Sequence, residues 1–169
     1  MPRAIERARA VGDYDGALRA ILQAFKYEGR RSLAVPLAAM MCRRGADVLA
    51  GAGCVVPVPL HRSRRRRRGF NQASDLARRL DLPVVHALRR VRATPTQTGL
   101  PAARRHRNVR GAFALARGGD AIGGAIVVLV DDVSTTRATL DACARVLKEA
   151  GAREVRALTA ARVVTKPRR

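Results

Sequence analysis

The sequence predicts an α/β fold in which a central, mainly parallel sheet is flanked by helices. Short apolar runs rich in β-branched residues alternate with segments of helical periodicity, and this alternation is typical of parallel α/β proteins. One run, Ile126–Val130, is continuously apolar, as in a strand buried on both faces. A chain of 169 residues with 47% hydrophobic residues corresponds to one domain. We expect its core to span about residues 14–162.

The first half of the chain combines amphipathic helices with one buried strand. Apolar residues three and four positions apart predict helices that pack by one face, and Gly29 ends the first of them. Pro57 and Pro59 limit further pairing of the strand. The expected elements are helices over 14–27 and 32–44, a strand over 54–58, a basic loop over 59–69 and a helix over 71–80.

The second half begins with irregular segments and ends with regular ones. Thr, Pro and Gly in 92–99 are typical of a mobile loop, and Gly151 suits the C-terminal cap of the long helix before it. The expected elements are an irregular stretch from 83, that loop, a short helix over 100–109, a strand over 112–115, a turn over 118–124, a strand over 126–130, a helix over 136–150, a strand over 155–161 and a frayed basic tail over 163–169.

The charge of the chain favours anionic partners. Lys and Arg number 34 against 13 Asp and Glu, which gives a formal net charge of +21, and six arginines fall within Arg62–Arg68. Arginine suits phosphate groups, so a small polyanion and a nucleic-acid backbone both fit, while a solvated basic surface is the structural alternative. Aromatic residues make up only 3% of the chain and offer few stacking platforms for bases, which favours nonspecific contact with nucleic acid.

The remaining composition predicts a cytoplasmic protein. No apolar run approaches the roughly 20 residues that span a bilayer, and the N-terminus has no apolar signal region. The three cysteines are scattered and form no Cys-x-x-Cys pair, so we predict reduced thiols and no protein-bound metal.

The segment AIVVLVDDVSTTRAT, residues 125–139, carries the strongest functional signal. Its strand ends in Asp131 and Asp132, and a hydroxyl-rich turn then opens a helix. Ligands of open α/β sheets bind at the carboxyl edge, where acids accept hydrogen bonds from sugar hydroxyls and free helix amides hold an anion. The segment therefore fits a sugar phosphate. A turn whose acids and threonines merely cap the helix is the structural alternative.

VVLVDDVSTTRAT resembles the phosphoribosyl pyrophosphate (PRPP) loop of type I phosphoribosyltransferases. The resemblance implies Asp131 and Asp132 as catalytic residues at the ribose, and a 5′-phosphate cradle made by Ser134, Thr135, Thr136, Arg137 and Thr139. Arg137 stands where the family usually has Gly, a residue that permits positive φ and close approach of the backbone to phosphate. The arginine would either add a charge to the phosphate or crowd the cradle.

Two further motifs resemble the ComF (competence protein F) branch of that superfamily. They are VPVPLHRSRRRRRGFNQ at 56–72 and RVRATPTQTGLPAARRHRNVRGAF at 90–113. The resemblance implies that His61 and Arg62 lie in a loop that binds pyrophosphate, and that a mobile hood carries Gln97, Arg104 and Asn108. It also implies Mg²⁺ bound through PRPP, and a homodimer is common in the superfamily. Many members add an N-terminal zinc segment with Cys-x-x-Cys pairs, which this sequence lacks.

These observations leave three hypotheses for the function. The protein transfers phosphoribosyl from PRPP to an unknown nitrogen acceptor, or it is a non-catalytic PRPP-fold protein that serves DNA uptake. A third, weaker hypothesis is a nucleic-acid-binding protein that acts through its arginine clusters.

Overall fold

The computed structural model describes residues 4–92, 109, 111–135 and 137–164. The chain forms the following elements: β1 (Arg7–Asp13), α1 (Gly16–Tyr27), the 3₁₀ helix η1 (Arg31–Leu33), α2 (Ala34–Arg44), α3 (Ala46–Leu49), β2 (Cys54–Pro57), α4 (Arg62–Arg68), α5 (Gln72–Ala77), β3 (Leu88–Arg90), β4 (Phe113–Leu115), the 3₁₀ helix η2 (Gly119–Ile122), β5 (Ile126–Ser134), α7 (Ala138–Glu149) and β6 (Glu154–Arg162).

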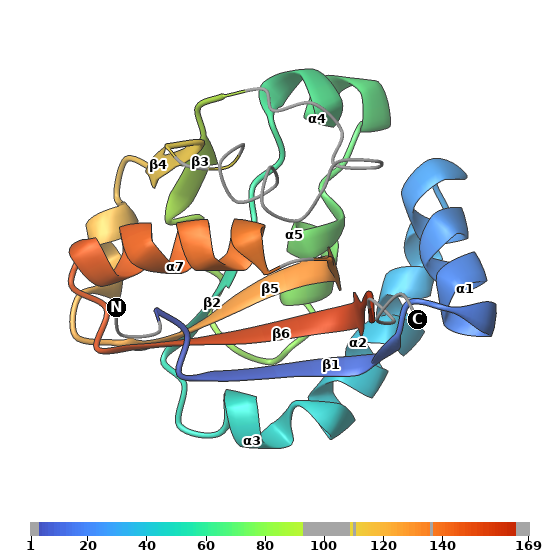
Figure 1. Ribbon diagram of the computed structural model, residues 1–169, viewed down its shortest axis with the longest axis horizontal. Helices are drawn as coiled ribbons and strands as arrows, with labels where there is room; N and C mark the ends of the chain where they lie inside the picture. The colour runs from blue at the N-terminus through green and yellow to red at the C-terminus, as the bar shows by residue number, and fades with distance from the viewer. Residues whose placement is uncertain (1–3, 93–108, 110, 136, 165–169) are drawn as a thin grey trace, which may run out of the picture.

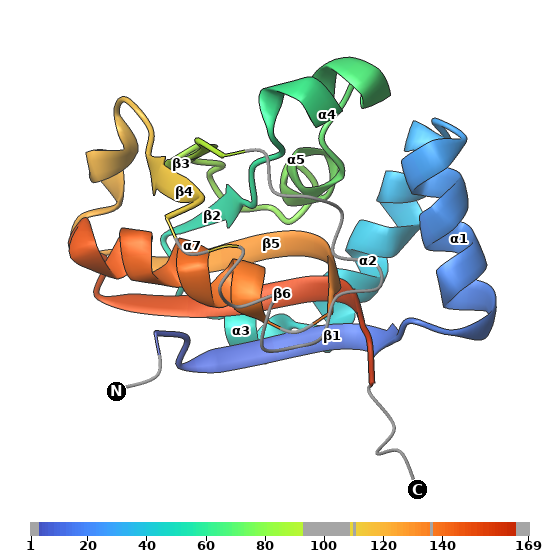
Figure 2. The same ribbon diagram turned by 45° about the horizontal axis from the view of Figure 1, so that its top comes forward.

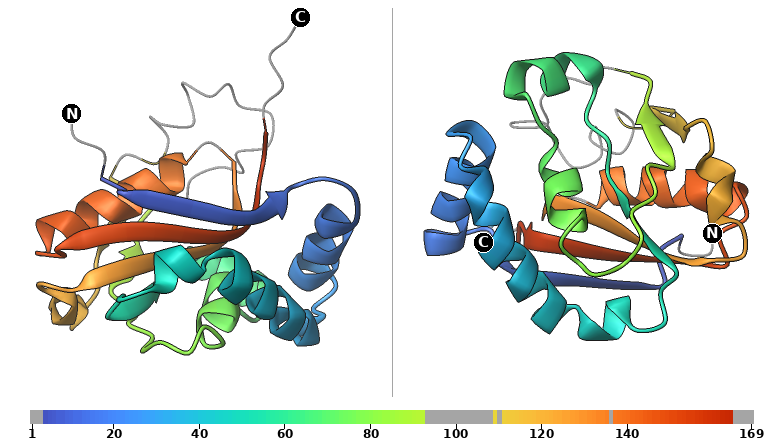
Figure 3. Two further views of the ribbon diagram at one scale, coloured as in Figure 1. Left: turned by 90° about the horizontal axis from the view of Figure 1, so that it is seen from below. Right: turned by 180° about the vertical axis from the view of Figure 1, so that it is seen from behind.

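Four strands make a parallel sheet in the order β1-β6-β5-β2, and a bridge between Val55 and Val84 extends it beyond β2. Figure 1 shows α7 in front of this sheet and α2 and α3 behind it, an arrangement that Figure 3 confirms from below. A separate antiparallel pair, β3 and β4, contacts α7 (Figure 2). This architecture confirms the predicted α/β class.

Two apolar layers form because successive side chains of a strand point to opposite faces. Val127 and Leu129 of β5 join the cluster that contains Leu140 and Leu147 of α7. Val128 and Val130 join the opposite cluster, which includes helices α1, α2 and α5. Strand β5 is therefore buried on both faces. The polar residues at its C-terminal end also point alternately to the two faces of the sheet.

The strand β1 was not predicted, so the sheet begins before the expected start of the core near residue 14. Its sequence, RARAVGD, alternates arginine with alanine, and the strand lies at the sheet edge beside β6. Arg9 pairs with Asp47 at 2.7 Å, and both side chains are exposed. Charged side chains on an edge strand discourage pairing with other chains. The short elements α3 and β3 were also not predicted.

The predicted basic loop over 59–69 is corrected, because residues 62–68 form the helix α4. Arginine is a good helix former, and basic residues suit the C-terminal end of the helix dipole. The backbone N–H of Ser63 donates to Nδ1 of His61 at 3.3 Å and caps the first turn. Gly69, with φ 76°, closes the helix in the left-handed conformation.

Candidate functional site

The acidic pair lies near the carboxyl end of β5, inside the strand rather than after it. The strand extends to Ser134, four residues beyond the predicted end at Val130. Because of the alternation along β5, Asp131 and Asp132 take different surroundings. Asp131 is half-buried and lines a small cavity, whereas Asp132 is 7% exposed and pairs with Lys26 of α1. The other residues of that cavity are Val133, Ser134, Thr135, Arg137, Thr139 and Leu140. The two carboxylates therefore have different neighbours: the cavity for Asp131 and Lys26 for Asp132.

Lys26 is a member of this site that sequence reasoning missed. Its Nζ lies 3.2 Å from Oδ2 of Asp132, and its side chain is 23% exposed. Burial, the largest influence, lowers the pKa of Lys26, but the charges of Asp132 and Asp131 outweigh it and leave that pKa raised. The signal was present: Lys26 follows Leu22 and Phe25 by four and one positions, on the apolar stripe of the amphipathic helix.

The pKa of Asp131 is raised well above its ordinary value. Burial is the main cause, the negative charge of Asp132 adds to it, and Lys26 offsets part of it. The backbone N–H of Asp132 donates to Oδ1 of Asp131 at 2.9 Å, and the N–H of Val133 donates to Oδ1 of Asp132 at the same distance. These bonds fix both carboxylates close to the strand. A carboxyl with a shifted pKa beside a cavity is a candidate functional group.

The predicted phosphate cradle surrounds a cavity of about 20 Å³. Ser134, Thr135, Arg137 and Thr139 line it together with Asp131. This volume holds about one water molecule, so a phosphate group requires the turn to open or the Arg137 side chain to move. The cradle residues are thus brought together, although their role in binding phosphate stays a prediction. Thr136 lies outside the described residues.

Arg137 adopts φ 59° and ψ −9°, the left-handed conformation that glycine occupies without a steric penalty. We expect Arg137→Gly to raise the free energy of unfolding by up to about 1 kcal/mol, because relief of backbone strain exceeds the entropy gained by the unfolded chain. It should also tighten PRPP binding if the side chain obstructs the cradle. Urea unfolding and calorimetric titration measure the two effects. Arg137→Ala, which removes the side chain but keeps a Cβ, is the matched control: it should leave the strain in place.

Arg90 of β3 interacts electrostatically with Asp131, and Arg64 of α4 interacts with Arg90. Burial lowers the pKa of Arg90 on β3, the charge of Arg64 on α4 lowers it further, and the negative charge of Asp131 opposes this change. The guanidinium of Arg90 also stacks over Phe113 at 5.3 Å. Strand β3 therefore brings the positive charge of Arg90 toward the acidic end of β5, where a polyanion would benefit from it.

The predicted pyrophosphate residues lie at the start of α4. Nδ1 of His61 contacts Oγ of Ser63 at 2.8 Å and caps the helix, so this ring has a structural partner. Arg62 is exposed at the first helical position. The hood residues Gln97, Arg104 and Asn108 lie outside the described residues.

The described residues contain no group of three or more His, Cys, Asp or Glu side chains that could hold a metal ion. Within the same ranges, no helix has the length and apolar character needed to cross a membrane. Cys42, Cys54 and Cys143 are free thiols, and burial raises the pKa of all three.

The class of protein follows from a family match and a structural match. A model of the phosphoribosyl transferase domain matches residues 66–169. A solved structure described as the allosteric regulatory enzyme of purine biosynthesis superposes with a TM-score of 0.53 at 23% identity. The superposed region covers 82% of the present chain and 30% of the chain of that enzyme. The fold is thus that of the phosphoribosyltransferases, as predicted.

Three sequence relatives narrow the class. Competence protein F of Haemophilus influenzae is 34% identical over 155 residues, which is 86% of this chain and 68% of that protein. DNA utilization protein YhgH of Salmonella typhi is 35% identical over 89% of this chain and 69% of its own length. Competence protein ComFC of Bacillus subtilis is 29% identical over 87% and 60%, respectively. The chain belongs to the ComF family of the phosphoribosyltransferase-like superfamily, and the predicted resemblance is confirmed.

Proposed function

We propose that the protein binds PRPP or a related phosphorylated ribose and transfers its phosphoribosyl group to a nitrogen acceptor. One observation carries this proposal: Asp131 lines the same cavity as Ser134, Thr135 and Thr139. A carboxylate beside hydroxyls and turn amides matches a ribose joined to a phosphate. His61 and Arg62, at the start of α4, would supply the contacts and positive charge for the leaving pyrophosphate.

In this reaction a nitrogen lone pair attacks ribose C1 while the C1–O bond to pyrophosphate breaks, and the acceptor nitrogen then loses a proton. Positive charge develops at the ring, and a carboxylate fixed nearby stabilises it. We assign this role to Asp131, because it lines the cavity that Asp132 does not reach and its Oδ1 accepts from a backbone N–H. Asp132 supports it indirectly by holding Lys26 near both acids.

The side chains present fit a Mg²⁺ ion carried by the ligand rather than one caged by the protein. Asp132 already forms an ion pair with Lys26. Asp131 forms no ion pair within the described part of the chain, so it is the carboxylate of this site that can contact the ion. Mg²⁺ commonly binds through one or two carboxylates, substrate phosphates and waters, and it would supply charge neutralisation of the pyrophosphate.

The test separates binding from catalysis. PRPP with Mg²⁺ is titrated calorimetrically into the wild type and into Asp131→Ala/Asp132→Ala, and pyrophosphate release is then followed with a panel of bases and amines. The proposal expects binding that the double variant loses, and release with at least one acceptor. Absence of PRPP binding to the folded wild type overturns it.

A second candidate is a non-catalytic PRPP-fold protein that serves DNA uptake. The left-handed Arg137 beside a cavity of about 20 Å³ favours it, since the cradle is closed in this state. The names of the relatives refer to competence and DNA utilization. PRPP binding without pyrophosphate release from any acceptor would select this candidate.

The high positive charge of the chain would support contact with DNA in either case. Contact through the arginine clusters predicts a DNA affinity that falls steeply with salt and survives the double Asp variant. Loss of DNA binding in that variant would contradict such contact.

A further inference from the structure

A second cavity, of about 510 Å³, lies outside the acidic site. Its walls come from the end of β2, from α4 and α5, from the segment around His86 and from Ala116 after β4, and it includes no residue of β5. Strand β2 separates this cavity from β5 in the sheet order. The volume lies within the range of small-molecule sites, about 300–1,000 Å³.

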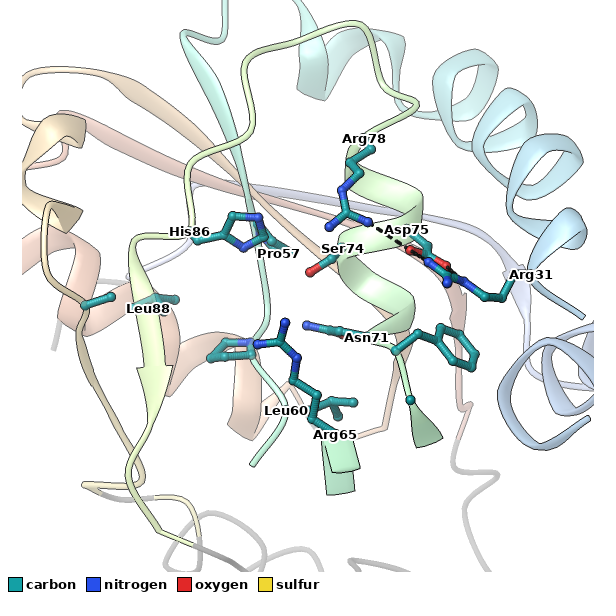
Figure 4. Close-up of a pocket in the computed structure, with 14 residues that line it drawn as sticks. Arg31, Pro57, Leu60, Arg65, Asn71, Ser74, Asp75, Arg78, His86 and Leu88 are labelled. Atoms are coloured by element: carbon teal, nitrogen blue, oxygen red, sulfur yellow. Dashed lines mark hydrogen bonds and ion pairs between the residues drawn. The ribbon is translucent and has the colours of Figure 1, made fainter. Parts of the chain in front are cut away.

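Polar groups from three directions converge on this cavity. Figure 4 shows Arg65, Ser74, Arg78 and His86 around one shared space. Arg65 comes from α4, Ser74 comes from α5, and His86 lies on the opposite wall beyond β2. Burial lowers the pKa of His86, and the charges of Arg78 and Arg65 lower it further, so both guanidinium groups act on this ring. The polar groups thus face a common volume.

The residues that line the cavity carry a net positive charge, and ion pairs hold two of its arginines in place. Asp75, whose side chain is 3% exposed, accepts from Arg31 at 2.7 and 2.8 Å and from Arg78 at 3.1 Å. This carboxylate orients two arginines and neutralises one of them. The cavity is therefore lined by three arginines against one carboxylate, with Leu60 and Leu88 as apolar surface. Arginine forks bind phosphate oxygens in pairs, and apolar walls receive an organic group.

We propose that this cavity is a second ligand site, which binds a small phosphate monoester through Arg65, Arg78 and His86. The proposal is independent of the PRPP site, because the two cavities share no lining residue. Each cation removed from the lining should weaken binding of a dianionic phosphate, whereas the neutral sugar alone should not bind.

The test uses ribose 5-phosphate as the probe and the ring signals of His86 as the local reporter. Those signals are assigned by their loss in His86→Gln. The proposal expects a saturable shift with ribose 5-phosphate and none with ribose. Arg65→Gln should weaken binding at least about 10-fold, the loss of a charge-assisted hydrogen bond. Arg67→Gln, an equal charge change on the same helix outside the cavity lining, should weaken it less than about 3-fold.

Two further variants distinguish binding at this cavity from binding at the PRPP site. Arg78→Gln should also weaken binding, while Asp75 retains Arg31, and circular dichroism checks that each variant is folded. Asp131→Asn should leave the His86 response unchanged, whatever it does to PRPP. Equal weakening by Arg65→Gln and Arg67→Gln, or probe binding that leaves the His86 signals unmoved, overturns the proposal.

Discussion

Replacement of Lys26 by methionine is expected to destabilise the protein by about 3 kcal/mol, because it leaves a buried carboxylate without its cation. The two side chains are 23% and 10% exposed, so solvent compensates little of the lost pairing. Methionine keeps the length of the aliphatic stem and its packing on α1. Urea unfolding at neutral pH measures the loss.

The control for this variant is Lys148→Met. Lys148 pairs with Glu6, but their side chains are 30% and 36% exposed, and exposed pairs contribute about 1 kcal/mol or less. The double variant Lys26→Met/Asp132→Asn should recover most of the stability, since it removes the stranded charge as well. A loss in Lys26→Met no larger than in Lys148→Met would show that Asp132 does not depend on Lys26.

Replacement of Asp131 by asparagine is expected to separate stability from ligand binding. PRPP affinity should fall at least about 10-fold, because a charged acceptor for the ribose hydroxyls becomes a neutral one. The free energy of unfolding at neutral pH should rise, because the charged form of this carboxyl is disfavoured by burial and by Asp132. Asparagine Oδ1 still accepts from the N–H of Asp132. Calorimetric titration and urea unfolding give the two results.

The sign of the pH dependence follows from the raised pKa of Asp131. The folded protein holds this proton more tightly than the unfolded chain, whose carboxyl has the ordinary value of 3.8. The contribution of Asp131 to stability therefore falls as pH rises above that value, and it levels off once pH exceeds the folded pKa. The difference between wild-type and Asp131→Asn stability, followed from acid to neutral pH, isolates this contribution.

The sequence was sufficient for the fold class and for the regular elements with strong patterns. Strand β5 was recognised from its continuous apolar run, and α7 from the spacing of Leu140, Cys143 and Leu147 on its buried face. A run this short and this rich in β-branched residues is typical of an interior strand buried on both faces. The arginine helix α4 was missed, because a charge run carries no hydrophobic periodicity and reads as solvated chain.

Some residues of the candidate site could be predicted from the sequence, and others could not. Local order along the chain places Asp131 beside Ser134, Thr135 and Thr139, so one motif predicts them together. The ion pair between Lys26 and Asp132, more than 100 positions apart, is set by the packing of α1 against the sheet. The cavity lined by Arg65, Arg78 and His86 likewise needs three separate segments to meet.

By itself, the sequence determined a parallel α/β chain with an acidic strand end and a hydroxyl-rich turn, because periodicity and motif order are local properties. Only the tertiary structure decided that the two acids have different partners, that Arg137 takes a left-handed backbone, and that cations line a second cavity. Strand alternation and helix packing fix these features, since each depends on which surfaces the folded chain brings into contact.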